Sequence, residues 1–204
     1  MTRIRILCGI VAGLSIAASG ALAAQTPSAM PDATATTFGG VGGRVDYSDG
    51  IDVGYRWYEV NGVRPLFPFG YGLSYTRFAF SGLKADPTAS GGLSVQATVT
   101  NVGPVAGADV VQCYLGFPSG SGEPPRQLRA FTRVQLAPRQ SQTVHLSLSP
   151  GDLATYNGAS GWVVPGGSFR VYVGDGSDLA NLPLSTTVAV RSASLGFDSG
   201  PAST

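Results

Sequence analysis

Short apolar runs recur through residues 78–190 at intervals of about ten residues, and glycine or proline separates most of them. In the clearest run, Leu93, Val95, Ala97 and Val99 alternate with polar residues, as in a strand with one buried face. The sequence contains no heptad pattern and no long amphipathic helix pattern. This spacing predicts an all-β domain built as an antiparallel sandwich.

The other runs give the expected strand positions: 78–81, 110–115, 126–136, 144–148, 162–164, 169–173 and 182–190. The run 110–115 is apolar enough for the centre of a sheet. We expect 162–164 to pair with 169–173 around the turn at 165–167. A brief helical turn is expected at 149–152, where proline stands near its start.

Residues 64–75 (RPLFPFGYGLSY) combine prolines, glycines and four aromatic residues. Pro65 and Pro68 fix φ and disfavour a helix, whereas Gly70 and Gly72 permit backbone angles closed to other residues. So much apolar surface is unusual in a free linker. We therefore predict an extended strap, named here by these residues, that packs against the sandwich.

The stretch before the strap also carries aromatic residues. Val53, Tyr55 and Trp57 alternate with Gly54, Arg56 and Tyr58, which predicts a short strand or extended piece, followed by a turn at 61–62. The predicted organisation is a lead-in and strap at 44–75, a sandwich at 76–192 and a flexible tail at 193–204.

The first residues have the features of a cleavable secretory signal. Arg3 and Arg5 precede an apolar stretch that ends in a small-residue cleavage site at 21–23. We expect a signal peptide at 1–23, a disordered linker at 24–43, and a periplasmic or extracellular protein with no membrane attachment after cleavage.

Charge and cysteine content narrow the function classes. Removing Arg3 and Arg5 from thirteen basic residues, against twelve acidic ones, leaves a net charge of −1 and predicts no nucleic-acid partner. Cleavage would also remove Cys8 and leave Cys113 without a disulfide partner. Cys113 lies in an apolar run, so a buried hydrophobic role is favoured over a reactive thiol.

The motifs support a family resemblance. Residues 47–56 (YSDGIDVGYR) and 65–75 (PLFPFGYGLSY), followed by 99–112, 128–134 and 169–174, resemble the C-terminal part of glycoside hydrolase family 3 enzymes, the β-glucosidase and β-xylosidase group. The resemblance implies an immunoglobulin/fibronectin type III-like sandwich. It also implies a preceding barrel domain and α/β domain that together hold the catalytic carboxylates.

Neither catalytic domain fits before residue 47, so the resemblance predicts a detached, non-catalytic terminal domain. Asp46, Asp49 and Asp52 are expected to be solvated turn residues rather than a catalytic pair. We expect no cofactor and no metal site. The loop at 175–178 is interpreted as a hairpin end, and His145 is expected to face solvent without a second histidine ligand.

Three arginines, Arg126, Arg129 and Arg133, lie in one expected strand at spacings that cannot share one strand face. They are interpreted as a solvated edge that resists strand pairing, with anion or glycan binding as the alternative.

The aromatic lead-in gives the binding hypothesis. Ten of the nineteen aromatic residues lie within residues 47–80, where the resemblance implies the seam between two domains. Folding back onto the sandwich is one alternative, and an open binding surface is the other. The predicted binding residues are Asp52, Tyr55, Arg56, Trp57 and Tyr58. The predicted partner is a hydrolase lacking this domain or a second copy; the alternatives are a polysaccharide, or a remnant without a present role.

Overall fold

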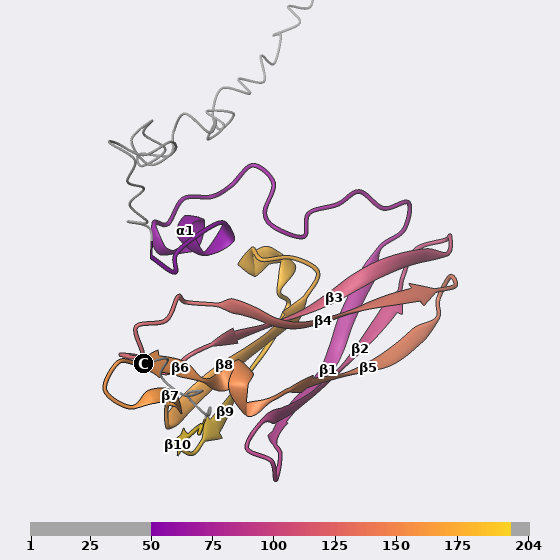
Figure 1. The fold of residues 1–204 in the computed structure, drawn as a ribbon. Coiled ribbons are helices and arrows are strands. Elements are labelled where there is room, and N and C mark those ends of the chain that lie inside the picture. Colours follow the sequence, from indigo (N-terminus) through magenta and orange to yellow (C-terminus); the bar gives the residue numbers. More distant parts are fainter. Residues whose placement is uncertain (1–49, 197–204) are drawn as a thin grey trace, which may run out of the picture.

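The computed structural model describes residues 50–196 (Figure 1). The predicted signal peptide and linker, the first part of the lead-in and most of the predicted tail lie outside these residues. The described part is a mostly β structure, so the predicted fold class is confirmed.

Two antiparallel sheets form the sandwich. The first has the order β1-β2-β5 and contains β1 (Phe78–Pro87), β2 (Leu93–Asn101) and β5 (Ser141–Leu148). The second has the order β4-β3-β8-β9 and contains β3 (Gly107–Gly116), β4 (Gln127–Leu136), β8 (Gly167–Gly174) and β9 (Leu184–Val190). Strand β3 is therefore central, as its apolar sequence predicted.

The core lies between these sheets and follows the sequence alternation. Leu93, Val95 and Val99 on β2 are fully buried, and β5 buries Val144, Leu146 and Leu148 while His145 faces solvent as expected. Cys113 on β3 is also fully buried, and burial raises the pKa of its thiol to about 12. The cysteine is thus a packed hydrophobe rather than a nucleophile.

Strand β3 differs from β2 because both of its faces are covered. Its last six residues, from Val111 to Gly116, are all buried. One face belongs to the core, and Figure 1 shows the other beneath α1 (Tyr55–Val60) and the strap. A strand covered on both sides reads as a continuous apolar run, which explains the sequence of this element.

The lead-in corrects one prediction: residues 55–60 are helical, not extended. Gly54 adopts φ 61°, and its carbonyl accepts hydrogen bonds from the amides of Trp57 and Tyr58. Asn61 ends the helix, since both its backbone amide and its side chain donate to the carbonyl of Trp57. The alternation that suggested a strand was only three residue pairs long, too short to separate the two periods.

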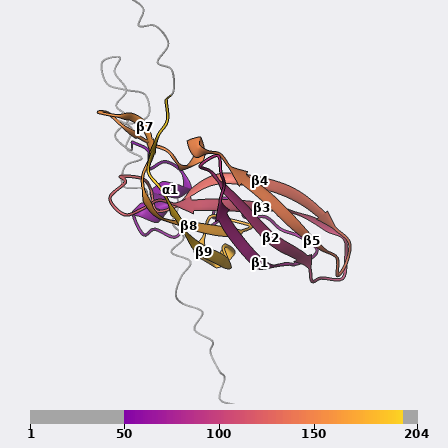
Figure 2. The same ribbon diagram turned by 90° about the horizontal axis from the view of Figure 1, so that it is seen from below.

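A third, small sheet was not predicted as such. It has the order β10-β7-β6, from β10 (Ala193–Ser194), β7 (Gly161–Val164) and β6 (Thr155–Asn157). Figure 2, like Figure 1, places β7 at the same end of the molecule as α1. The predicted pairing of 162–164 with 169–173 is wrong, because β8 pairs with β3 and β9 instead. The predicted tail also begins with a strand.

Two 3-10 helices complete the described elements. The segment η2 (Pro150–Leu153) confirms the predicted helical turn, and Ser149 and Asp152 form a capping box at its start. The segment η3 (Leu179–Asn181) lies in the connection from β8 to β9. This connection reaches the strap and helps to position it.

Candidate functional site

Helix α1 is fixed to the outer face of the four-stranded sheet through Tyr55. The Tyr55 hydroxyl accepts a hydrogen bond from the backbone amide of Leu128 on β4, at 2.8 Å. Its ring meets Tyr114 of β3 edge to face, with centroids 5.7 Å apart, and lies 5.6 Å from Phe69 of the strap. One side chain thus joins helix, sheet and strap.

A buried ion pair forms the second attachment. Arg126 Nη2 lies 2.9 Å from Glu59 Oε1, and the two side chains are only 10% and 15% exposed. The Arg126 guanidinium also lies over the ring of Tyr172 on β8. Burial raises the pKa of Glu59, and the charge of Arg126 opposes this rise.

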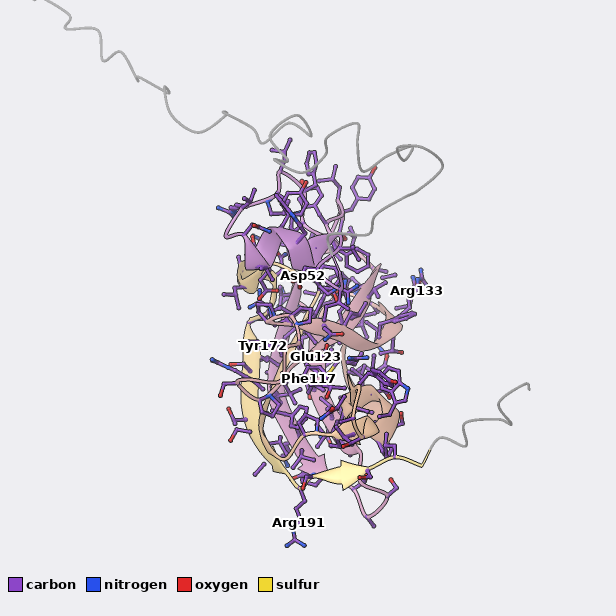
Figure 3. The ribbon with its side chains drawn as sticks, turned by 60° about the vertical axis from the view of Figure 1, so that its left-hand side comes forward. Asp52, Phe117, Glu123, Arg133, Tyr172 and Arg191 are labelled. Carbon is purple, nitrogen blue, oxygen red and sulfur yellow. The ribbon has the colours of Figure 1, made fainter. Side chains whose placement is uncertain are left out.

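The predicted solvated arginine edge is therefore only partly correct. Arg126 is buried in the attachment just described, and Arg129 lies over the ring of Phe117. Arg133 alone of the three is exposed. Figure 3 shows Arg133 standing away from Phe117 and Tyr172. The sequence could not reveal this difference, because Glu59 lies far from Arg126 along the chain.

A chain of hydrogen bonds continues from the sheet to the connection between β8 and β9. The Tyr114 hydroxyl donates to Gln112 Oε1 at 2.6 Å, and Gln112 Nε2 donates to the carbonyl of Asp175 at 2.9 Å. Burial is the main cause of the raised pKa of Tyr114. These partners satisfy polar groups on the covered face of β3, which would otherwise be costly to bury.

The strap is held near its middle and directly after its last residue. The Ser177 amide donates to the carbonyl of Phe69 at 2.9 Å, and the Thr76 hydroxyl donates to Asn101 Oδ1 at 2.5 Å. Gly70 adopts φ 90°, and a Cβ there would lie 2.5 Å from Gln112 Nε2 and 2.8 Å from the Asp175 carbonyl oxygen. The strap can pass this point only because residue 70 is glycine.

The strap presents large apolar side chains to solvent. Leu73 and Tyr75 are 92% and 96% exposed. We call the following exposed residues the strap face: Leu66, Phe67, Phe69, Tyr71, Leu73 and Tyr75, with Val110 and Phe131 of the underlying sheet. The strap thus folds back onto the sandwich and also exposes apolar surface, because its backbone is anchored while its side chains project outward.

The binding residues predicted from the sequence lie outside the strap face. Trp57 is buried at 8% exposure, so the expectation that it is exposed is wrong. Tyr55, Arg56 and Tyr58 are half-buried, and so is Asp52, which Figure 3 places beside α1. Helix formation explains the difference, because it turns these side chains toward neighbouring elements rather than leaving them alternately exposed.

A groove of about 600 Å³ separates the strap from the edge of the sheet. Its lining includes Asp109, Asp175, Arg77 and Arg133. Burial, and then the charge of Asp175, raises the pKa of Asp109, while a hydrogen bond from the Val110 amide lowers it. Nothing in the sequence indicates that Asp109 and Asp175 lie near each other, because they come from distant parts of the chain.

The loop at 175–178 connects β8 to β9, as expected for a hairpin end. Its acidic groups have structural partners: Asp178 caps η3, and Asp175 Oδ1 accepts a hydrogen bond from Asn181. Within residues 50–196, no group of three or more histidine, cysteine or acidic residues is arranged to hold a metal ion.

Comparison with known proteins connects this architecture to a family. Residues 109–177 match the family model described as a fibronectin type III-like domain. A probable β-glucosidase L of Aspergillus terreus is 39% identical over 173 residues, and a β-glucosidase of Rhizobium radiobacter is 40% identical over 164 residues. The matches cover 75% and 76% of this chain but only 24% and 19% of those proteins.

Comparison with solved structures shows the same relationship to β-glucosidases. A β-glucosidase from Streptomyces venezuelae, in complex with D-glucose, superimposes with a TM-score of 0.73 at 38% identity, over 78% of this chain and 20% of that one. A Bifidobacterium adolescentis GH3 β-glucosidase has the same TM-score at 30% identity, over 81% and 25% of the two chains. This chain contains a fibronectin type III-like domain related to family 3 β-glucosidases.

The predicted resemblance is thereby confirmed. The fibronectin type III-like chain spans about a fifth to a quarter of the length of these relatives. It therefore matches only a fragment of each enzyme. In residues 50–196, the structure has no helix that is long and apolar enough to cross a membrane.

Proposed function

We propose that this chain is a secreted, non-catalytic accessory module that docks to a protein partner through the strap face. The proposed partner is a family 3 hydrolase core that lacks a fibronectin type III-like domain. The observation that carries this proposal is the row of exposed apolar side chains on a strap whose backbone is held in place.

The size and chemistry of the strap face favour a protein partner. Six strap side chains are more than half exposed, including two phenylalanines and two tyrosines. Soluble monomers rarely expose contiguous apolar patches of more than roughly a few hundred Å², and larger patches usually mark binding sites. Aromatic residues are also the typical anchors of protein interfaces.

The anchored backbone also favours docking. The Phe69–Ser177 and Thr76–Asn101 hydrogen bonds fix the strap before any partner binds. Docking would then cost little ordering entropy, in contrast to a flexible peptide that must fold on binding. An anchored strap also fits the family resemblance, which implies that this region forms the seam between two domains.

Catalysis would come from the partner. The relatives named as β-glucosidases contain several times more chain than this protein matches. Hydrolysis with retention of configuration needs two carboxylates about 5–5.5 Å apart across a sugar site. Asp109 and Asp175 share their groove with Arg77 and Arg133, and we assign them no catalytic role.

Titration calorimetry tests the docking. The probe is the Rhizobium radiobacter β-glucosidase shortened by the segment that this chain matches, used once it shows a cooperative thermal melt. We expect saturable binding that Phe67→Ala and Leu73→Ala each weaken about tenfold or more, as for interface anchors.

Tyr156→Ala is the matched control, because Tyr156 is equally exposed but lies on β6, outside the strap face. It should leave the affinity for the shortened hydrolase unchanged. Absence of binding by the wild-type chain, or equal losses in all three variants, would contradict docking through the strap face.

A polysaccharide is the second candidate ligand, favoured by a different pair of aromatic residues. Tyr156 and Trp162 lie opposite each other on β6 and β7, with ring centroids 5.6 Å apart, and are 65% and 45% exposed. Such rings could stack on a sugar. Retention on insoluble cellulose, xylan or chitin that Tyr156→Ala abolishes would support this candidate, and no retention would remove it.

A further inference from the structure

The end of the strap has the side-chain pattern of an unpaired strand. Tyr71, Leu73 and Tyr75 alternate with Gly72 and Ser74, and all three large side chains are exposed. In extended backbone, alternate residues project to one side. The segment therefore offers three large apolar side chains to a neighbouring chain.

After Tyr71, most of the backbone of this segment also has no hydrogen-bond partner among the described residues. Among residues 50–196, none forms a hydrogen bond with the backbone N–H or C=O groups of Gly72, Leu73 or Tyr75. The groove of about 600 Å³ lies between this segment and the sheet, so its own domain does not supply a strand partner. Unpaired backbone beside exposed apolar side chains is a template for pairing with another chain.

Contacts hold the chain at the start of the segment and directly after its end. The Tyr71 amide donates to the Pro68 carbonyl at 2.9 Å, and Thr76 is buried against Asn101. Recognition of an extended segment by strand addition is favoured when the segment is already ordered.

The sequence of the segment is complementary to itself. In an antiparallel pair centred on Leu73, Leu73 would face Leu73 of the second copy, and Tyr71 would face its Tyr75. Gly72 would then face Ser74, and no charged residue lies between 65 and 76 to oppose a like charge. Aromatic and branched aliphatic cross-strand pairs stabilise antiparallel sheets.

We propose that, in the absence of a hydrolase, residues 71–75 of two copies of this chain pair as antiparallel strands and form a symmetric dimer. This pairing rests on the proposed function in one respect, since both proposals use the strap face as a binding surface. Hydrolase docking would cover the same side chains, so a bound core would replace the second copy.

Sedimentation velocity of the purified chain, from micromolar to millimolar concentration, tests the pairing. We expect a monomer–dimer equilibrium that Leu73→Lys shifts at least tenfold toward monomer, because two lysines would face each other at the centre. Tyr156→Lys, at an exposed position outside the segment, should leave the equilibrium unchanged. A monomeric wild-type chain at all concentrations would overturn the proposal.

Hydrogen exchange separates strand pairing from contact through side chains alone. As the dimer forms, amide exchange at alternate residues of 71–75 should slow at least tenfold in the wild-type chain, but not in Leu73→Lys. A dimer without this protection would overturn the strand pairing. If the chain remains monomeric but binds the shortened hydrolase, the pairing fails while the proposed function stands.

Discussion

At the scale of single residues, one of the two attachments of α1 is a buried ion pair. Arg126→Ala would leave the Glu59 carboxylate buried without its cation. Removing one member of a buried pair typically costs about 3–5 kcal/mol of unfolding free energy. We therefore expect a large loss in urea denaturation, whereas Arg133→Ala, at an exposed position on β4, should change stability by less than about 0.5 kcal/mol.

Similar losses for Arg126→Ala and Arg133→Ala would contradict the role assigned to this pair. The same comparison shows why the sequence alone did not distinguish the buried arginine from the exposed one. Three arginines on one strand looked equivalent, and the partners that distinguish them, Glu59 and Phe117, come from other parts of the fold.

Asp109 gives a prediction with a definite pH dependence. Its pKa is raised in the folded state, so the native protein binds a proton more tightly there than the unfolded chain does. Ionised Asp109 therefore lowers stability as pH rises through the raised pKa, and the penalty is absent below its unfolded pKa. We expect Asp109→Asn to be more stable than wild type at neutral pH, and this advantage to disappear at acid pH.

Urea midpoints at neutral and acid pH measure this effect. The asparagine side chain can still accept the hydrogen bond from the Val110 amide, so the comparison isolates the charge. A variant that is less stable than wild type at neutral pH, or one with the same advantage at both pH values, would be evidence against it.

At the scale of elements, the position of the strap depends on Gly70. In Gly70→Ala, the new Cβ would meet Gln112 Nε2 and the Asp175 carbonyl in a backbone conformation that alanine rarely adopts. We expect a loss of about 1–3 kcal/mol in unfolding free energy, because the strap must shift or the backbone must remain strained.

Gly72→Ala is the matched control. Nothing lies within 4 Å of a Cβ at that position, and its φ is not in the left-handed region. Its thermal melt should therefore resemble that of the wild type. If both alanine variants melt alike, Gly70 does not fix the strap.

The elements also show what a sequence can and cannot predict. Strands β1, β2, β5 and β8 have one face in the core, so alternation located them. Helix α1 has six residues and β6 only three, too few for either period to be distinguished. The strap was recognised from its prolines and aromatic residues, but which of its side chains were exposed depended on contacts with β3 and the β8–β9 connection.

At the scale of the whole molecule, the proposed function is that of a module that binds a partner and does not hydrolyse glycosides. The sandwich supplies a rigid support, α1 and the β8–β9 connection hold the strap, and the strap presents its apolar side chains. Relatives of this chain contain the same domain as about a fifth to a quarter of a β-glucosidase. The remaining part of such an enzyme would supply the chemistry.

The most direct measurement is the turnover of chromogenic β-glucosides and β-xylosides by the purified chain alone. We expect none, at any enzyme concentration and across the pH range in which the chain is folded. Turnover that co-purifies with the chain and disappears in Asp109→Asn or Asp175→Asn, while those variants keep their thermal melt, would contradict the account.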